Sequence, residues 1–314
     1  MAPPTKPIAR VAFQGEHGAF SEAAAIQLLG DWITTVPRAT FDSAFRAIAE
    51  GAADALLAPV ENSLAGSVVR VYDLLLESNL GIVAETILPI EHHLIGCPGA
   101  TLRDLRSVSS HPMALAQCER FFQTHPDLKR VPAEDTAGSV RDVLASGDKS
   151  AAGIAGRQAA TRYGGVILSE SIQDNAENFT RFVLLTPTPK PPADCDPTES
   201  SIPWEYPAAA KLFLDLRTGQ MEQVTSPLIF KMSIALRLAH KPGALLAALE
   251  PFAQRGINLL KIESRPIHGR PWEYQFFLDV QTESPEQIKA AIQAVRAATS
   301  FSRILGLYPP ARSQ

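Results

Sequence analysis

Cysteine is scarce in this sequence and forms no cluster. The 314 residues contain three cysteines, Cys97, Cys118 and Cys195, which are widely spaced and odd in number. A disulfide framework and a Cys-type zinc site both need cysteines in a closer, paired pattern. We therefore expect three reduced thiols and neither kind of cross-link.

Long apolar runs and runs of positive charge are missing as well. No stretch approaches the roughly 20 apolar residues of a membrane-spanning helix, and the opening MAPPTKPIAR lacks the apolar core of a secretory signal. The net charge is −4, and lysine and arginine form no stripe that would suit a nucleic acid. We expect a cytoplasmic protein without membrane or nucleic-acid partners.

The signatures of several enzyme classes are also absent. Residues 15–18, GEHG, lack the Gly-Lys-Ser/Thr of a P-loop and the third glycine of a dinucleotide site. Neither GxSxG nor HExxH occurs. The adjacent His92 and His93 lie on an expected strand, so their side chains should point to opposite faces rather than share an ion. We expect no metal site.

The order of apolar runs predicts two domains of different kinds. Over residues 8–186, short apolar runs alternate with helical segments, which is typical of an α/β domain with mostly parallel strands. Residues 187–207 hold seven of the chain's 25 prolines, and we interpret residues 187–228 as an extended linker. Residues 229–308 predict the ferredoxin-like order βαββαβ.

Several predicted helix starts could bind an anion. HPMALAQCERFFQT predicts one helix over residues 111–124, with Gln117 close to its start. Ser67 is expected to open and cap a helix, and Thr136 to cap another. A helix N-terminus carries free N–H groups and a partial positive charge, which suit a carboxylate. The alternative is that both hydroxyls are ordinary caps without a ligand.

The segment NFTRFVLLT predicts a strand that places a hydroxyl on a buried face. Because side chains alternate along a strand, Thr180 and Phe182 share one face and Arg181 lies on the other. A buried hydroxyl needs a hydrogen-bond partner. Thr180 therefore either bonds to the chain or faces a pocket in which a ligand is its partner.

Seven segments occur in an order that resembles one enzyme family. They are AFQGEHGAFSEAAA, APVENSLAGSV, HPMALAQC, DTAGSV and SIQDNAENFTRF, followed by PGALL and IESRP. The chain resembles prephenate dehydratases that carry a C-terminal ACT regulatory domain, over about residues 8–186 and 229–308. The expected strand begins by residue 10, which leaves no room for the chorismate mutase bundle of bifunctional relatives, so we expect a monofunctional enzyme.

The resemblance implies a two-lobed catalytic domain like type II periplasmic binding proteins, with the site between the lobes. One lobe would comprise about residues 8–80 plus 176–186, and the other residues 83–175. A ferredoxin-like ACT domain would follow the linker.

The resemblance also implies a reaction. Prephenate dehydratases expel CO2 and the 4-hydroxyl of prephenate to give phenylpyruvate in phenylalanine biosynthesis. Aromatisation supplies the driving force, so no cofactor is expected. The implied catalytic residues are Thr180, Glu61 and Asn62, and the implied substrate-binding residues are Ser63, Gln117, Thr136, Arg181 and Phe182. Thr180 would stabilise the departing hydroxyl, and Glu61 would donate a proton if burial keeps its carboxyl protonated. The alternative for Glu61 is a salt-bridged or capping carboxylate.

The ACT resemblance implies feedback inhibition by phenylalanine bound across a subunit interface, and hence a homodimer or homotetramer. The implied contacts are Gly243, Ala244, Leu245, Asn258, Leu259, Glu263, Ser264, Arg265 and Pro266. The alternative for residues 243–246 is an amphipathic helix start with core leucines.

Two other functions stay open. DTAGSV and ENSLAGSVVRVYDLLL look closer to plant arogenate dehydratases, which act on the amino counterpart of prephenate. A non-catalytic sensor of small acids is the other alternative, because solute-binding proteins share the two-lobed fold.

Overall fold

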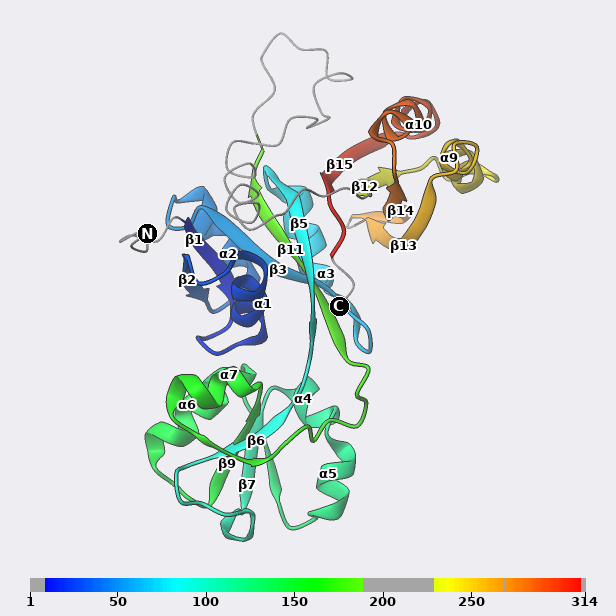
Figure 1. Ribbon diagram of the computed structural model, residues 1–314. Helices are drawn as coiled ribbons and strands as arrows, with labels where there is room; N and C mark the ends of the chain where they lie inside the picture. The colour runs from blue at the N-terminus through cyan, green and yellow to red at the C-terminus, as the bar shows by residue number, and fades with distance from the viewer. Residues whose placement is uncertain (1–8, 189–228, 268, 312–314) are drawn as a thin grey trace. The chain divides into compact units, whose positions relative to one another are not determined.

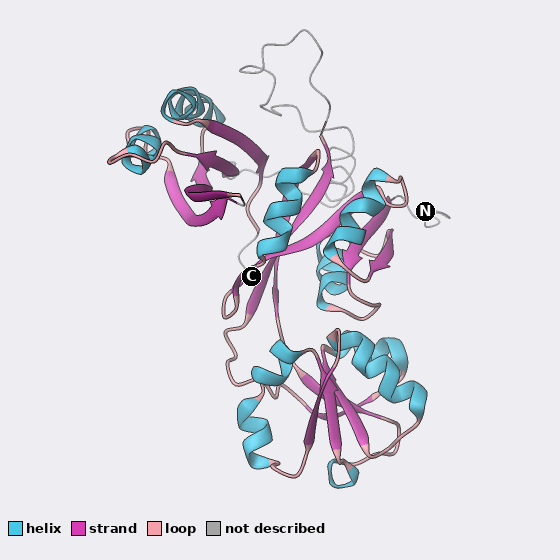
Figure 2. Cartoon of the chain, turned by 180° about the vertical axis from the view of Figure 1, so that it is seen from behind, coloured by secondary structure: helices cyan, strands magenta, loops and turns pink. Residues whose placement is uncertain are grey.

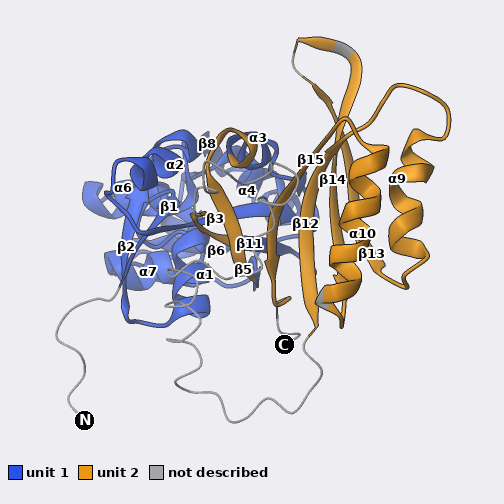
Figure 3. Cartoon of the chain, turned by 90° about the horizontal axis from the view of Figure 1, so that it is seen from above, with its two compact units in different colours: residues 1–74, 86–183 blue, residues 75–85, 184–314 orange. Residues whose placement is uncertain are grey.

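A computed structural model describes residues 9–188, 229–267 and 269–311. The predicted linker, including Cys195, lies almost wholly outside the described residues. The chain forms two compact units, coloured separately in Figure 3: unit 1 comprises residues 1–74 and 86–183, and unit 2 residues 75–85 and 184–314. The predicted domain limits of 8–186 and 229–308 stay a prediction.

Unit 1 begins with a parallel sheet (Figure 1). Strand β1 pairs in parallel with β2 and β3, and β11 lies next to β3. Helices α1 and α2 pack against β1 and β3. The elements are β1 (Ala9–Gln14), α1 (Phe20–Leu29), β2 (Ile33–Arg38), α2 (Phe41–Ala49), β3 (Ala55–Asn62) and β11 (Phe179–Pro187). We call this part, residues 9–74 with 179–183, the first lobe.

The second lobe, residues 86–172, has its own five-stranded sheet in the order β10-β6-β9-β7-β8. Figure 2 shows helices on both sides of this sheet, which bury it between two apolar clusters. Its elements are β6 (His93–Gly96), η1 (Leu102–Asp104), β7 (Ser107–Ser110), α4 (Pro112–Ala116), α5 (Glu119–Thr124), β8 (Lys129–Pro132), α6 (Thr136–Ser146), β9 (Ala151–Ala155), α7 (Arg157–Tyr163) and β10 (Val166–Ser169).

A strand and an irregular segment, residues 170–178, connect the lobes. Strand β5 (Leu80–Pro89) leads into the second lobe, and the chain returns to β11 of the first lobe after β10. The first lobe is thus built from two segments that are separated in sequence by the second lobe.

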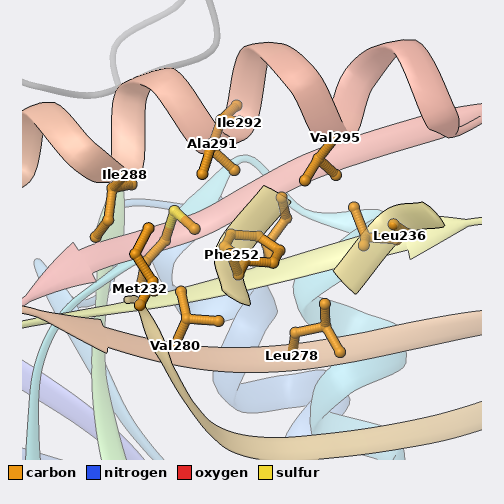
Figure 4. Packing of buried hydrophobic residues seen from close by; sticks show 12 residues of the cluster. Met232, Leu236, Phe252, Leu278, Val280, Ile288, Ala291, Ile292 and Val295 are labelled. Atoms are coloured by element: carbon orange, nitrogen blue, oxygen red, sulfur yellow. The ribbon is translucent and has the colours of Figure 1, made fainter. Parts of the chain in front are cut away.

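Unit 2 contains the predicted βαββαβ order. Its strands follow the order β13-β14-β12-β15, and the first half of β5 lies beside β15. Helices α9 and α10 cover the sheet over a core of buried side chains such as Met232, Phe252 and Ile292 (Figure 4). The elements are α3 (Val69–Glu77, shared with unit 1), β12 (Phe230–Arg237), α9 (Ala244–Ala253), β13 (Asn258–Ile267), β14 (Arg270–Thr282), α10 (Pro285–Ala298) and β15 (Phe301–Tyr308).

Three local predictions were wrong. The single helix expected over residues 111–124 is two helices, because the chain breaks at Gln117 and Cys118. Ser67 does not open a helix but belongs to β4 (Gly66–Ser67), which folds back antiparallel onto Glu61 and Asn62. Thr136 is the first residue of α6 rather than its cap, because the Asp135 carboxylate accepts the bond from the Gly138 N–H.

No helix among the described residues is long and apolar enough to cross a membrane.

Candidate active site

A cavity of about 650 Å³ lies in unit 1, and both lobes line it. Its wall combines aromatic and aliphatic side chains with polar groups. The residues lining it include Gln14, Phe20, Ser21, Thr40, Phe41, Asp42, Ile90, His92, His111, Met113, Gln117, Glu134, Asp135, Thr136, Thr180 and Phe182. This volume and chemistry suit a small, partly apolar molecule with hydrogen-bonding groups.

Thr180 and Phe182 share one face of β11, and both line the cavity. The Thr180 hydroxyl is held by Asn62, whose Nδ2 lies 2.9 Å from Oγ1. Because Asn62 Nδ2 is the donor, Thr180 Oγ1 accepts this bond and keeps its own hydrogen for another partner. Thr180 therefore bonds to the chain and also faces a pocket.

The orientation of the Asn62 amide is set by the backbone. Its Oδ1 accepts bonds from the N–H groups of Leu64 and Ala65, at 3.0 and 2.8 Å. Its Nδ2 must therefore be the donor to Thr180 and to Oδ1 of Asn178, which lies 2.8 Å away. The ENSLA turn thus fixes the direction of a hydrogen-bond chain that leads into the cavity.

The chain continues into the second lobe. Because Asn178 Oδ1 is an acceptor, its Nδ2 donates to Oε1 of Gln117 at 3.1 Å. Gln117 Oε1 also lies 2.9 Å from Nε2 of His92. With both bonds on its oxygen, Gln117 keeps its –NH2 group for a ligand. Asn178 and His92 are buried, so these two members of the chain are shielded from water.

A helix start also reaches the cavity. Asp135 caps α6, and Asp135 and Thr136 both line the cavity. The loop before α1 packs closely against α7 of the second lobe, because a Cβ on Gly18 would lie 2.9 Å from Ala159 Cα. The Tyr163 hydroxyl donates to the carbonyl of His17 at 2.7 Å across the same contact.

Four predicted residues do not line the cavity: Asn62, which holds Thr180 from behind, and Glu61, Arg181 and Ser63. Glu61 and Arg181 are absent from the cavity lining, and their side chains form an ion pair with Nη2 3.3 Å from Oε2. The Glu61 side chain is 38% exposed, so it lacks the burial that a proton-donating role required and fits the alternative of a salt-bridged carboxylate. Ser63 is a turn residue: its Oγ donates to the carbonyl of Glu177 and accepts from the N–H of Phe179.

A smaller cavity of about 150 Å³ lies in unit 2. Ala244 and Leu245 line it, and Gly243 precedes them with φ 78°, a left-handed conformation that favours glycine. The other predicted contacts, Asn258, Leu259, Glu263, Ser264, Arg265 and Pro266, lie along β13 and do not line this cavity. Nη1 of Arg265 is buried without a hydrogen-bond partner among the described residues.

Sequence reasoning missed His92. The opposite directions of the His92 and His93 side chains were used only to exclude a shared metal ion. The same alternation has another consequence, because Ile90 and His92 are two residues apart and both line the cavity. Phe20 was missed as well; its ring packs edge-on against that of His92, with centroids 5.6 Å apart.

Comparisons with known proteins agree with this geometry. The family model "Prephenate dehydratase" matches residues 11–190, and the model "ACT domain" matches residues 232–297. Arogenate dehydratase/prephenate dehydratase 2 of Arabidopsis thaliana, a chloroplastic protein, is 36% identical over 310 residues, which are 96% of this chain and 72% of the relative.

Two solved structures are similar over nearly the whole chain. Prephenate dehydratase of Arthrobacter aurescens, in complex with L-Phe, has a TM-score of 0.76 and 29% identity, covering 96% of this chain and 90% of the other. GqqA, described as a novel type of quorum quenching acylase, has a TM-score of 0.77 and 32% identity, covering 96% and 98%.

Proposed function

This chain belongs to the prephenate dehydratase family and carries an ACT domain, and from that premise we propose how its cavity converts prephenate to phenylpyruvate, CO2 and water. The observation that carries the proposal is the Thr180 hydroxyl, which lines the cavity and accepts a bond from Asn62. Its hydrogen is left for the oxygen that departs from the substrate.

The reaction needs positioning and charge stabilisation rather than a nucleophile. Breaking the bond between C4 and its oxygen and losing the ring carboxylate as CO2 leaves an aromatic ring. Thr180 donates a hydrogen bond to the oxygen as negative charge develops on it. Phe182 supplies an apolar surface for the ring, and the –NH2 of Gln117 and the hydroxyl of Thr136 bind the carboxylates.

Glu61 and Arg181 have a different place in this proposal. Their ion pair lies on the other face of β11 and supports the strand that carries Thr180. Ser63 ties the turn after β3 to the start of the same strand. These three residues hold the site rather than contact the substrate.

Feedback regulation follows from the ACT domain. Phenylalanine binds in unit 2 near Gly243–Leu245 and the β13 residues 258–259 and 263–266, and lowers the activity of the catalytic cavity. The L-Phe complex of the Arthrobacter aurescens protein supports this ligand. Such coupling requires that phenylalanine binds two states of the enzyme with different affinity.

We also propose a cytoplasmic homodimer or homotetramer. Strand β13 lies at the edge of its sheet and carries the exposed side chains of Leu260 and Ile262, at 45% and 43%. An apolar edge strand of this kind is suited to pair with a second copy. Light scattering coupled to size-exclusion chromatography measures the mass, and a monomer would contradict the proposal.

Arogenate is the second candidate substrate. The Arabidopsis relative is named for both substrates. Arogenate has the same ring and hydroxyl, so Thr180 would act in the same way and only the side-chain contacts would differ.

The decisive experiment measures product formation from prephenate and from arogenate, each with and without phenylalanine. Phenylpyruvate from prephenate, suppressed by phenylalanine, supports both parts of the proposal. A preference for arogenate changes the substrate and keeps the mechanism. No turnover by a folded protein that binds phenylalanine would instead favour a sensor.

An acylase assay belongs beside it because of the similarity to GqqA. An acyl-transfer nucleophile needs a neighbouring base. Among the described residues that line the cavity, the hydroxyls of Ser21, Thr40, Thr136 and Thr180 make no hydrogen bond to a histidine. We therefore expect no acyl hydrolysis.

A further inference from the structure

Glu61 does not line the cavity, so the proposed reaction has no assigned proton donor. The proposed reaction consumes one proton. Prephenate is a dianion, whereas the products are the phenylpyruvate monoanion, CO2 and water. A threonine hydroxyl can donate a hydrogen bond but holds its proton too tightly near neutral pH to supply it. The cavity must contain another group that titrates.

The carboxylates that line the cavity are poorly placed for this task. Asp42 is ion-paired with Arg70, and Asp135 caps α6. Glu134 is exposed to solvent. Two of these carboxylates are engaged by other parts of the chain and the third is open to water, so none is a buried acid directed at a bound substrate.

His92 has the required geometry. Its side chain lines the cavity and the residue is only 2% exposed. Nε2 is held by Gln117, and Nδ1 is buried without a hydrogen-bond partner among the described residues. Buried polar atoms normally have a hydrogen-bond partner, so this unpaired imidazole nitrogen is an exception that needs an explanation. A bound substrate is the partner that this cavity can supply.

The hydrogen-bond chain determines which nitrogen exchanges a proton. The backbone N–H groups of Leu64 and Ala65 fix Asn62, Asn62 fixes Asn178, and Asn178 fixes the Gln117 oxygen as an acceptor. Nε2 of His92 must therefore carry a hydrogen in both protonation states. The proton that comes and goes is the one on Nδ1.

Resting on the proposed function, we propose that His92 is the general acid of the reaction and that its Nδ1 gives a proton to the departing 4-hydroxyl. The bond between C4 and oxygen breaks as the ring carboxylate leaves as CO2, and the electron pair of that carbon–carbon bond enters the ring. The oxygen takes the Nδ1 proton and leaves as water. Neutral His92 is then reprotonated from solvent when the next substrate binds.

Burial sets the resting state of this acid. Desolvation lowers the pKa of His92 below its ordinary value, with the hydrogen bond to Gln117 acting in the opposite direction and the neighbouring His93 adding to the shift. The free cavity therefore holds a neutral imidazole at neutral pH. A dianionic substrate favours the charged imidazolium, so His92 takes up a proton when the substrate binds. The titratable groups on the surrounding elements are His93, His111, Asp42, Glu134, Asp135 and Asp174.

Two substitutions separate proton transfer from positioning. In His92→Gln, an amide N–H can replace Nε2 and keep the bond to Gln117, but no proton can be delivered. We expect kcat to fall about 10²–10⁴-fold, the range for loss of a general acid. In His92→Asn, an amide N–H stands near the place of Nδ1 and the same loss is expected. His125→Gln, outside the cavity, is the matched control and should keep wild-type kinetics.

The pH dependence of kcat/KM separates a general acid from a structural residue, because loss of a structural residue does not change the shape of the profile. In the wild type, kcat/KM should fall tenfold per pH unit on the alkaline side, starting below the ordinary histidine pKa of about 6.5. This fall should disappear in His92→Gln. Activity of His92→Gln within tenfold of the wild type, with the alkaline fall retained, would overturn the proposal.

Other outcomes are also decisive. If the alkaline fall disappears in His111→Gln and persists in His92→Gln, the acid is the other cavity histidine and our assignment is wrong. Circular dichroism and phenylalanine binding show whether each variant is folded. If His92→Gln does not fold, the same measurements on His92→Asn test the proposal. Failure of the proposed function is distinguishable, because the wild type would then form no product from either substrate.

Discussion

The ammonium of Lys231 lies 3.0 Å from a carboxylate oxygen of Glu85, and both side chains are buried in unit 2. Asp279 lies 3.9 Å from the same ammonium and also bonds to Ser233. A second Glu85 oxygen accepts from the N–H of Ala311 at 2.9 Å. One lysine on β12 thus faces a carboxylate on β14 and another on β5.

Replacing Lys231 with methionine should destabilise unit 2 strongly. It keeps most of the side-chain volume but leaves the buried Glu85 carboxylate uncompensated, which typically costs about 3–5 kcal/mol. Urea unfolding followed by circular dichroism measures the loss. Lys289→Met on the exposed face of α10 is the control and should change stability by less than about 0.5 kcal/mol. Equal effects of the two substitutions would show that the buried pair contributes nothing.

Thr180→Ala should lower kcat about 10²–10³-fold, the usual loss when one donor to a developing oxyanion is removed. Thr180→Ser keeps a hydroxyl near Asn62 and should retain most of the activity. Steady-state kinetics with prephenate tests both variants, and thermal melting confirms folding. Near-normal turnover by Thr180→Ala would remove Thr180 from the mechanism.

Gly306→Ala should destabilise unit 2 for a steric reason. An added Cβ would lie 2.2 Å from the carbonyl oxygen of Ile82, where β15 and β5 pair. The required backbone shift should cost about 3 kcal/mol. Gly51→Ala is the comparison: its φ of +69° is strained for alanine, but nothing lies within 4 Å, so the cost should be about 1–2 kcal/mol. A smaller effect at Gly306 than at Gly51 would show that the strands do not approach so closely.

Cys118 should resist thiol reagents in the native protein. Burial raises the pKa of its thiol to about 12, so at pH 8 almost no thiolate is present to react. Maleimide labelling followed by peptide mass mapping should find Cys118 unmodified until urea is added. Rapid native labelling at this position would mean that the core around α5 opens.

Arg265→Ala and Ser264→Ala test the regulatory site. The unpaired buried Nη1 of Arg265 is suited to a carboxylate, so Arg265→Ala should raise the phenylalanine concentration for half-inhibition at least tenfold, the effect of losing about 1.4 kcal/mol. Basal turnover should change little. The two side chains alternate along β13, so Ser264→Ala should have the weaker effect if only one face binds the ligand. Unchanged inhibition in both variants would place the site elsewhere.

Much of this architecture was predictable from the sequence. The strand that carries Thr180 and Phe182 is marked by its alternation, and the βαββαβ order of residues 229–308 is marked by apolar runs that alternate with helical segments. The resemblance added the two-lobed fold. Strands β2 and β8 were missed because they are short and their apolar pattern is weak.

The site was harder to predict because its residues act through partners that are distant in sequence. Alternation places Thr180 on a face, but it does not reveal that Asn62, 118 residues away, holds its oxygen. The exposure of Glu61 and its pairing with Arg181 depend on how β3 and β11 meet. His92 becomes meaningful only when the break after α4 brings Gln117 against it.

The two-segment construction of the first lobe has a consequence for synthesis. Strand β3 lies between β1 and β11 in the sheet, but β11 is translated only after the whole second lobe. Until then β3 is an open edge of the sheet, although its first four residues, 55–58, are buried in the finished lobe. An apolar open edge invites pairing with other chains. The nascent protein therefore passes through a stage in which this apolar edge can pair with other chains, and the synthesis of β11, which carries Thr180, ends that stage.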